Sequence, residues 1–442
     1  MNALADRPLD LAEIARPNFS PVLGRYYEHS WSHGEGHRLY DTAGRAYLDF
    51  ANGIAVSVLG HRHPRVTAAI HEQVDRLIAP CAAVGYAEPT VRHAALLAAT
   101  LPAPLDTVLF MNSGSEAIEA AIKLARRVTG RPGIIAFRGG FHGRTLGATS
   151  ITSSNVNYRV GYEPLLPGVY LTAFPSAYRD YAGDEARATT QAIRHLEALV
   201  ASTIPASAVA AIVIEPVQGE GGYVPASPAF LQFLRGFCDE HGILLVADEV
   251  QCGFGRTGEM WGFEHAGIVP DVVCVAKAIA NGLPLSGIVT RRELQERWGR
   301  GAHGTTYGGN PVACAAGIAV LETIADERLV ENAAVQGRRL MDGLRTLMAA
   351  DDRIGDVRGL GLMIGTEFVT DRASRTPDGA TCEAVRAVCS DEGLLLLSCG
   401  VEHNVIRWIP PLDVSAAEVD EALAIFARAL AAVAPAGEAA GI

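Results

Sequence analysis

A lysine and an aspartate stand at the ends of two apolar segments that have the length of buried strands. Lys277 lies within the stretch VCVAKAIA, and Asp248 closes the run GILLVA. Burial lowers the pKa of a lysine and leaves an amine that can attack a carbonyl carbon. A buried carboxylate needs a cation or N–H donors to stay ionised. The pair indicates amine chemistry beside a fixed negative charge, although a surface lysine and a core ion pair would give the same pattern.

Two glycine-containing loops could accept a ligand next to this pair. Residues 112–116 (NSGSE) open a segment with helical spacing, and residues 139–145 (GGFHGRT) place an aromatic ring beside an arginine. A helix N-terminus presents free N–H groups and the positive end of a dipole, which suits a phosphate. Because GxxxxGK is missing, the first loop is not a P-loop. Taken singly, each loop is equally well explained as an ordinary turn.

Together, the four features are the parts needed to hold pyridoxal phosphate (PLP). The helix N-terminus would take the phosphate, and the aspartate would pair with the pyridine nitrogen. The lysine would form a Schiff base with the aldehyde, and the aromatic ring would stack on the cofactor. The combination is more specific than any one of the features.

Short apolar runs alternate with helical segments through the middle of the chain. The runs are residues 107–111, 133–137, 208–214, 243–247 and 272–275. Continuous apolar strands separated by helices predict a mostly parallel sheet, and ligands bind at the carboxyl ends of such strands. The four features follow these runs, so we expect the sheet to bring them together.

Segments on either side of this sheet predict further elements. Residues 39–50 have the composition of a β-hairpin, and residues 64–100 have the spacing of helices. Nearer the C-terminus, residues 327–348 predict a helix and residues 360–368 predict a strand. The sequence SAAE at residues 415–418 is a capping box that would open a last helix.

We therefore expect an α/β fold with two domains. A large domain built on the mostly parallel sheet would comprise residues 55–318, and a smaller α+β domain would comprise residues 319–442. Residues 1–54 would form an N-terminal segment that packs with the smaller domain.

Composition excludes several classes of protein. Of the 442 residues, 49% are hydrophobic and 19% charged, so the chain can bury a large core. A net charge of -12 argues against a nucleic-acid binder, and no apolar run is long enough to span a membrane. Residues 1–20 lack a signal peptide, and the eight cysteines lack metal-site spacing. We expect a cytoplasmic protein with no metal, nucleic-acid or membrane partner.

The motifs, in chain order, carry a resemblance to a known family. From about residue 39 to residue 412 the chain resembles the class III (ω-amino acid) aminotransferases, which have the aspartate aminotransferase fold, fold type I of the PLP-dependent transferases. Within the family, the chain is most similar to the enzymes that act on 4-aminobutyrate, because of the runs GIAV, LSCG and NVIR. The acetylornithine aminotransferases share GIAV, so LSCG is the main discriminator. The motifs are FANGIAVSVLGHRHP, MNSGSEAIEAAIKLAR, GFHGRT, IEPVQGEGG, LLVADEVQCGFGRTG, VAKAIANGLPL, TTYGGNP, VRGLGLMIG and LSCGVEHNVIRWIPPL.

The resemblance implies roles for the residues of a cofactor site. Lys277 would form the Schiff base and move the proton, and Asp248 would hold the pyridinium proton. The other cofactor-binding residues would be Gly114 and Ser115 at the phosphate, Phe141 and Val250 on the two ring faces, His142, Gln251 at the phenolic oxygen, and Thr306 at the phosphate of the neighbouring subunit. The resemblance thus implies a homodimer with shared active sites, which could pair further into a dimer of dimers.

The resemblance also implies a division of labour between substrate-binding residues. Arg144 would bind the distal carboxylate of both substrates, and Arg407 would bind the α-carboxylate of glutamate or 2-oxoglutarate, each as a bidentate pair. With an ω-amino acid, Glu220 would pair with Arg407 and cancel its charge, and Ile54 would line the pocket. The expected reaction moves the amino group of 4-aminobutyrate to 2-oxoglutarate in a ping-pong cycle.

Other activities remain open at this level. Acetylornithine, ornithine, lysine or 5-aminovalerate could be the donor, since the same arginines and glutamate could serve any of them. A PLP-dependent amino-acid racemase or epimerase would use the same cofactor site. A non-catalytic PLP-binding regulator would need a DNA-binding module, for which the N-terminal segment is too short.

Overall fold

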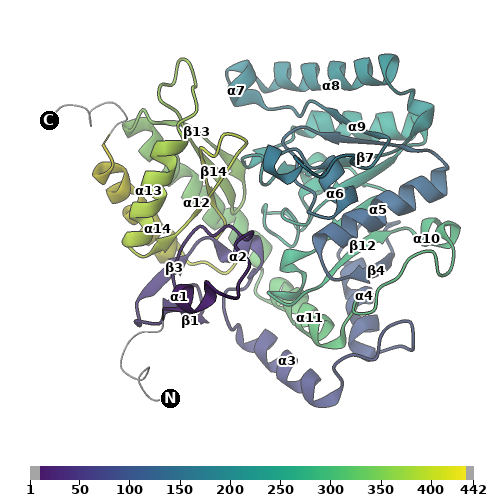
Figure 1. Ribbon diagram of the computed structural model, residues 1–442, viewed down its shortest axis with the longest axis horizontal. Coiled ribbons are helices and arrows are strands. Elements are labelled where there is room, and N and C mark those ends of the chain that lie inside the picture. The colour runs from purple at the N-terminus through teal and green to yellow at the C-terminus, as the bar shows by residue number, and fades with distance from the viewer. Residues whose placement is uncertain (1–9, 435–442) are drawn as a thin grey trace.

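The computed structural model describes residues 10–434, which form two lobes with the N-terminal segment lying against the smaller one (Figure 1). The larger lobe contains a seven-stranded sheet in the order β4-β12-β11-β10-β7-β5-β6. Neighbouring strands are parallel except at β12, which is antiparallel to both β11 and β4. The strands are β4 (Thr107–Met111), β5 (Gly133–Phe137), β6 (Val169–Thr172), β7 (Val209–Ile214), β10 (Leu244–Asp248), β11 (Val272–Val275) and β12 (Ser286–Thr290). The expected mostly parallel sheet is confirmed.

Both faces of this sheet are buried under helices. Ile134 and Val246 belong to the hydrophobic cluster that includes helix α5, whereas their neighbours Ile135 and Leu245 belong to the cluster that includes α9. Burial on both faces explains why these strands are continuous apolar runs. The helices of this lobe are α3 (Pro64–Arg76), α4 (Glu88–Ala99), α5 (Gly114–Thr129), α6 (Leu146–Ile151), α7 (Ala177–Tyr181), α8 (Glu185–Ser202), α9 (Pro228–His241), α10 (Arg292–Trp298) and α11 (Pro311–Asp326).

Short elements complete the larger lobe. They include the two-stranded ribbon of β8 (Val217–Gln218) and β9 (Val224–Pro225), which follows β7. The 3-10 helices are η1 (Val156–Tyr158), η2 (Ala206–Ala208), η3 (Gly262–Ala266) and η4 (Lys277–Ala280).

The smaller lobe is a four-stranded antiparallel sheet, ordered β13-β14-β17-β16 and packed with helices. The strand expected around residues 360–368 is found as β14. The preceding strand, β13, was not predicted, and Gly361 (φ 52°) lies in the turn that leads from β13 into β14. The capping box at residues 415–418 is confirmed at the start of α14. The elements are α12 (Leu329–Ala350), β13 (Ile354–Leu360), β14 (Met363–Phe368), α13 (Gly379–Asp391), β16 (Leu397–Cys399), β17 (Val405–Trp408) and α14 (Ala416–Ala432).

The N-terminal segment forms a third sheet with a strand from the smaller lobe. The hairpin expected over residues 39–50 is confirmed as the antiparallel pair β2 and β3, and β3 also runs parallel to β15. The elements are α1 (Leu11–Ala15), β1 (Trp31–Glu35), β2 (Arg38–Asp41), β3 (Ala46–Asp49), α2 (Asn52–Ala55) and β15 (Leu394–Leu395).

Two expectations stay predictions after the fold is known. The domain boundary expected between residues 318 and 319 falls inside α11, and the division into these two domains stays a prediction. The lack of a signal peptide concerns a stretch whose first nine residues lie outside the described part of the chain. Within residues 10–434 no helix is long and apolar enough to cross a bilayer.

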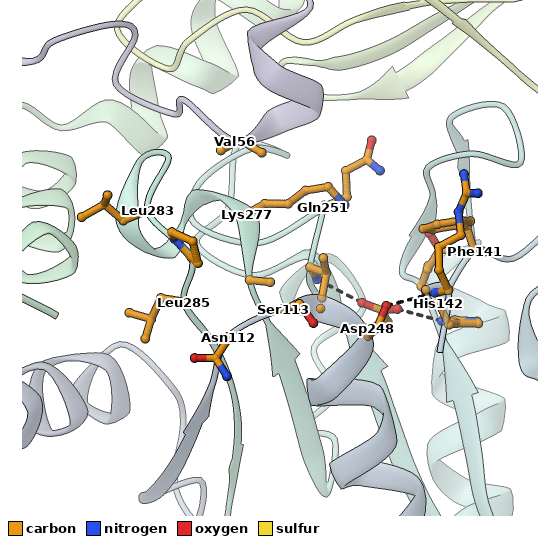
Figure 2. Close-up of a pocket in the computed structure, with 18 of the residues that line it drawn as sticks. Val56, Asn112, Ser113, Phe141, His142, Asp248, Gln251, Lys277, Leu283 and Leu285 are labelled. Carbon is orange, nitrogen blue, oxygen red and sulfur yellow. Dashed lines mark hydrogen bonds and ion pairs between the residues drawn. The ribbon is translucent and has the colours of Figure 1, made fainter. Parts of the chain in front are cut away.

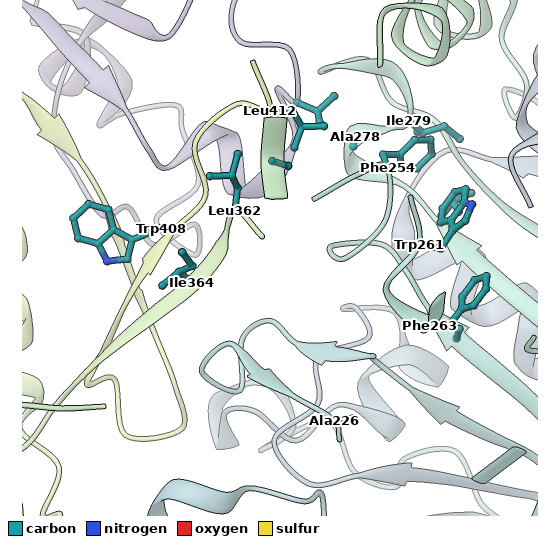
Figure 3. Close-up of a cluster of buried hydrophobic side chains, with 14 of the residues drawn as sticks. Ala226, Phe254, Trp261, Phe263, Ala278, Ile279, Leu362, Ile364, Trp408 and Leu412 are labelled. Carbon is teal, nitrogen blue, oxygen red and sulfur yellow. The ribbon is translucent and has the colours of Figure 1, made fainter. Parts of the chain in front are cut away.

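One hydrophobic cluster is continuous between the two lobes (Figure 3). It joins Phe254 and Trp261 of the larger lobe to Trp408 and Leu412 of the smaller one. Arg256, buried in the same region, donates hydrogen bonds to the carbonyl oxygens of Leu362 and Pro410. This shared core fixes the two lobes relative to each other.

Candidate active site

A pocket of about 310 Å³ opens at the carboxyl ends of the strands of the large sheet (Figure 2). Side chains from β10, from the N-terminus of α5 and from the loop after β5 meet there, and Lys277 extends across the space between them. The predicted site residues that line it are Gly114, Ser115, Phe141, His142, Arg144, Asp248, Val250, Gln251 and Lys277.

The N-terminus of α5 offers two free hydrogen-bond donors to the pocket. Ser113 caps the helix by accepting from the N–H of Glu116 at 3.3 Å, and the Glu116 carboxylate accepts from the N–H of Ser113 at 3.1 Å. The N–H groups of Gly114 and Ser115 find no acceptor among residues 10–434. A Cβ on Gly114 would lie 3.1 Å from Val250 Cγ1, so a side chain would crowd the pocket. This helix end suits a phosphate group.

Asp248 is held at the base of the pocket by a buried histidine and a main-chain donor. Its Oδ2 lies 2.7 Å from Nδ1 of His142, and its Oδ1 accepts from the N–H of Val250 at 3.1 Å. Burial alone would lower the pKa of His142, but the hydrogen bond and charge of Asp248 outweigh burial and raise it. The histidine therefore holds the carboxylate of Asp248 in place, where it could pair with a protonated ring nitrogen.

Lys277 begins η4 directly after β11 and has a left-handed backbone conformation, with φ 47°. Non-glycine residues adopt this conformation at a cost, and such residues concentrate at functional sites. Burial lowers the pKa of the Lys277 amine, while the carboxylates of Asp248 and Glu220 act in the opposite direction. An amine with a lowered pKa is a better nucleophile and proton acceptor near neutral pH.

Glu215, which was not predicted as a site residue, ties two loops of the pocket together. Its carboxylate accepts from the N–H of Phe141 at 3.0 Å and from the N–H of Gly219 at 3.1 Å. Burial raises the pKa of Glu215 to about 7. The signal that could have found it is the one that pointed to Asp248, because Glu215 also directly follows a buried apolar strand.

Arg407 and Glu220 form an ion pair between the lobes. Arg407, on β17, is 1% exposed; its Nη1 donates to Glu220 and its Nη2 donates to the hydroxyl of Tyr26 at 2.9 Å. Burial disfavours the charged guanidinium, but Glu220 outweighs burial and the pKa of Arg407 is raised. Sequence reasoning missed Tyr26, which lies in no motif.

Arg144 is exposed and lies over two aromatic rings. Its guanidinium carbon is 4.0 Å from the ring centroid of Tyr158 and 5.8 Å from that of Phe141. The preceding residue, Gly143, has φ 129°, and a Cβ there would lie 2.2 Å from Oγ of Ser115. Only glycine allows this loop to approach α5 so closely. Tyr158 was also missed, because nothing in the local sequence marks it as a partner of Arg144.

Four of the predicted site residues lie outside the lining of this pocket: Glu220 and Arg407, which pair with each other, and Ile54 and Thr306. Ile54 is partly buried and packs with the cluster that contains Tyr47 and Leu395. Thr306 is exposed on the loop before α11 and borders a separate small cavity with Tyr307. The expected roles of all the site residues stay predictions, including those of Ile54 at the substrate and of Thr306 at a neighbouring subunit's phosphate.

Comparison with known proteins places the chain among enzymes. Residues 25–430 match the family model for aminotransferase class-III. The 4-aminobutyrate aminotransferase of Escherichia coli (strain K12) is 42% identical over 396 residues, covering 89% of this chain and 91% of that protein. The 5-aminovalerate aminotransferase of Pseudomonas putida is 42% identical over 395 residues, with the same coverage of 89% and 91%.

A solved structure confirms the expected fold class. The amine transaminase from an uncultivated Pseudomonas species, crystallised in its PLP-bound form, has a TM-score of 0.87 and 33% identity, over 94% of this chain and 98% of that one. The family match and this likeness extend over both lobes and over the residues that line the pocket. The chain therefore belongs to the class III aminotransferases, enzymes of the aspartate aminotransferase fold.

Proposed function

We propose that this enzyme uses PLP to transfer the amino group of an ω-amino acid, with 4-aminobutyrate as the preferred donor, to 2-oxoglutarate. The observation that carries the proposal is the buried ion pair of Arg407 with Glu220 at the lobe interface. An arginine whose charge can be cancelled by a movable partner suits a site that alternately takes a substrate with one carboxylate and a substrate with two. The relatives named for 4-aminobutyrate and for 5-aminovalerate support an ω-amino donor.

The donor set of the pocket fits PLP. The free N–H groups of Gly114 and Ser115 match a phosphate, the carboxylate of Asp248 matches a pyridinium nitrogen, and the amine of Lys277 matches an aldehyde. When bound, the cofactor supplies a carbonyl that accepts the amino group and a ring that withdraws electrons from the reacting carbon.

The residues around the cofactor hold and move protons. Nζ of Lys277, with its lowered pKa, would take the proton from the substrate carbon that bears the amine. It would then deliver that proton to the carbon of the cofactor that receives the amino group. Asp248 would keep a proton on the ring nitrogen, and the hydrogen bond from His142 would keep that carboxylate in place. Phe141, beside its partner Tyr158, would cover one face of the ring and limit the access of water.

The substrate residues would act in turn. Arg144 is exposed and free to bind the distal carboxylate of either substrate. Arg407 would bind the α-carboxylate of 2-oxoglutarate once the side chain of Glu220 has moved away. With 4-aminobutyrate, Glu220 would stay on Arg407 and leave a neutral surface beside the amine.

We further propose a homodimer with shared active sites. Large apolar side chains are exposed on the segment from α3 to α4, including Ile78 at 57% and Tyr86 at 97%. Tyr307, next to Thr306, is 68% exposed. A second copy would cover such surface, which is unusual on a monomer, and would bring Thr306 to its neighbour's site. Light scattering on the loaded enzyme tests this, and a monomer would contradict it.

A panel of amino donors tests the activity. The visible absorbance of the PLP-loaded enzyme should bleach on adding 4-aminobutyrate and return on adding 2-oxoglutarate. The panel should include 5-aminovalerate, ornithine, acetylornithine and lysine, ranked by the bleaching rate. Lack of bleaching by every donor, together with exchange of a substrate's Cα–H for deuterium, would instead identify a racemase or epimerase.

A further inference from the structure

The loop that carries Glu220 is anchored by its main chain to the smaller lobe. The carbonyl oxygen of Glu220 accepts from the N–H of Gly400 at 2.9 Å. The carbonyl oxygen of Gly222 accepts from Nε and Nη2 of Arg358 at 3.0 and 2.7 Å. These contacts leave the side chain of Glu220 as the part of the loop that reaches Arg407.

Arg358, on β13, is itself fixed by two carboxylates. Its Nη1 donates to Asp356 at 2.9 Å and to Glu367 at 2.6 Å, and its side chain is 15% exposed. All three guanidinium nitrogens therefore have partners. The rigid planar fork of an arginine makes this arrangement possible, whereas a lysine has a single charged nitrogen on a flexible stem.

Gly222 has the backbone conformation that this contact requires. Its φ is 115°, which side-chain-bearing residues rarely adopt, and a Cβ there would lie 3.1 Å from Nη2 of Arg358. The glycine thus lets its carbonyl oxygen and the guanidinium approach each other two residues after Glu220.

We propose that Arg358 is a positioning residue that sets how tightly Glu220 pairs with Arg407. It would thereby set the preference between a substrate with one carboxylate and a substrate with two. The inference rests on the proposed function. With the main chain held, only the side chain of Glu220 leaves when 2-oxoglutarate binds, and it returns to the same place. Without the hydrogen bonds from Arg358, the loop would move and the charge of Arg407 would no longer be cancelled beside an ω-amino donor. The donor half-reaction would therefore slow the most.

The test compares the two half-reactions by single-turnover absorbance of the PLP-loaded enzyme. In Arg358→Gln, kcat/KM for the ω-amino donor should fall about tenfold, while the value for 2-oxoglutarate should change less than about twofold. Arg358→Lys, which keeps the charge near Glu367, should lie between Arg358→Gln and the wild type. Arg179→Gln is the matched control, because Arg179 also pairs with Glu367 but, among residues 10–434, forms no hydrogen bond or ion pair with the loop. Both half-reactions should stay within about twofold of wild type.

A second background shows whether Arg358 acts through Glu220. In Glu220→Gln, which already lacks the charge that cancels Arg407, adding Arg358→Gln should change the donor half-reaction less than about twofold. An equal loss in both half-reactions, or an undiminished loss in the Glu220→Gln background, would overturn the inference. The proposed function fails separately, if the wild type carries out neither half-reaction or if Glu220→Gln affects both half-reactions alike.

Discussion

The proposed cofactor side and the proposed substrate side of the site are held in different ways. On the cofactor side, Asp248 is fixed by a buried histidine and a main-chain N–H, and the start of α5 is fixed by a capping box. On the substrate side, Arg407 and Glu220 hold each other, and Arg144 lies exposed on Tyr158. A rigid frame suits a ligand that stays, whereas exchangeable side-chain pairs suit two ligands that alternate.

The largest effect is expected from removing the reactive amine on the rigid side. Lys277→Ala should lower both half-reactions by at least about 1,000-fold, because the amine that we propose bonds the cofactor and moves the proton is lost. Single-turnover absorbance measures each half separately. A loss confined to one half would break the comparison, since a cofactor residue must serve both.

The chain provides its own control for this prediction. Lys123, exposed on α5, is the one other lysine in the sequence. Lys123→Ala should keep both rates within about twofold of wild type. Borohydride reduction of the loaded enzyme should place the cofactor's mass on the peptide with Lys277, and a label on Lys123 would contradict the assignment.

The next largest effect should separate the two arginines of the substrate side. Arg407→Ala should lower the 2-oxoglutarate half-reaction about 100-fold by removing a charge-assisted bidentate contact, and the donor half-reaction less than about tenfold. Arg144→Ala should impair both halves, because both substrates carry a distal carboxylate. The measurement is kcat/KM for each substrate, and an equal loss in both halves for Arg407→Ala would end the proposed division of labour.

The strands of the large sheet and the residues at their ends could be predicted from the sequence. Residues 133–137 and 272–275, continuous apolar runs buried on both faces, were predicted as strands and are β5 and β11. The pocket residues nearest these strands follow from the fold rule that ligands bind at the strands' carboxyl ends. Local pattern was sufficient here because a continuous apolar run marks a strand that is buried on both faces, and the first polar residue after the run marks where that strand ends.

Where long-range contacts decide burial, local pattern failed. Strand β12 is buried although it contains Ser286 and Thr290, because their hydroxyls donate to the carbonyl oxygens of Ser113 at 2.7 Å and Asp271 at 2.6 Å. Tyr26 and Tyr158 reach the arginines only through the folded arrangement of distant segments. No spacing within the sequence encodes such contacts.

A smaller effect is expected at the aromatic support of Arg144. Tyr158→Leu removes a cation–π contact at an exposed site, which is worth about 0.5–1 kcal/mol, so kcat/KM should fall about threefold for both substrates. Tyr158→Phe keeps the ring and should stay near wild type. If the phenylalanine variant were as impaired as the leucine variant, the hydroxyl rather than the ring face would be the supporting group.

The smallest effect on activity, with a clear effect on stability, is expected at His37. This residue ties the N-terminal segment, which also carries Tyr26, to the start of α14. Its Nδ1 bonds Glu418 at 2.8 Å and its Nε2 lies 3.0 Å from Asp413. Burial disfavours the charged ring, but the two carboxylates outweigh burial and raise the pKa of His37 from 6.5 to about 9. Burial disfavours the charged carboxylate of Glu418, but the contact with His37 and the hydrogen bonds from Ser415 outweigh burial and lower the pKa of Glu418 to about 2.

The sign of the pH effect follows from these shifts. A raised histidine pKa stabilises the folded chain fully below about pH 6.5, and the stabilisation is lost as pH rises through about 9. Its size is on the order of 3 kcal/mol at most. The melting temperature of the wild type should therefore exceed that of His37→Gln most near pH 6 and converge with it by about pH 10. His33→Gln, on strand β1 of the same N-terminal sheet but exposed, should show no such convergence. A pH-independent difference for His37→Gln would mean that packing, rather than the ion pairs, joins this segment to the smaller lobe.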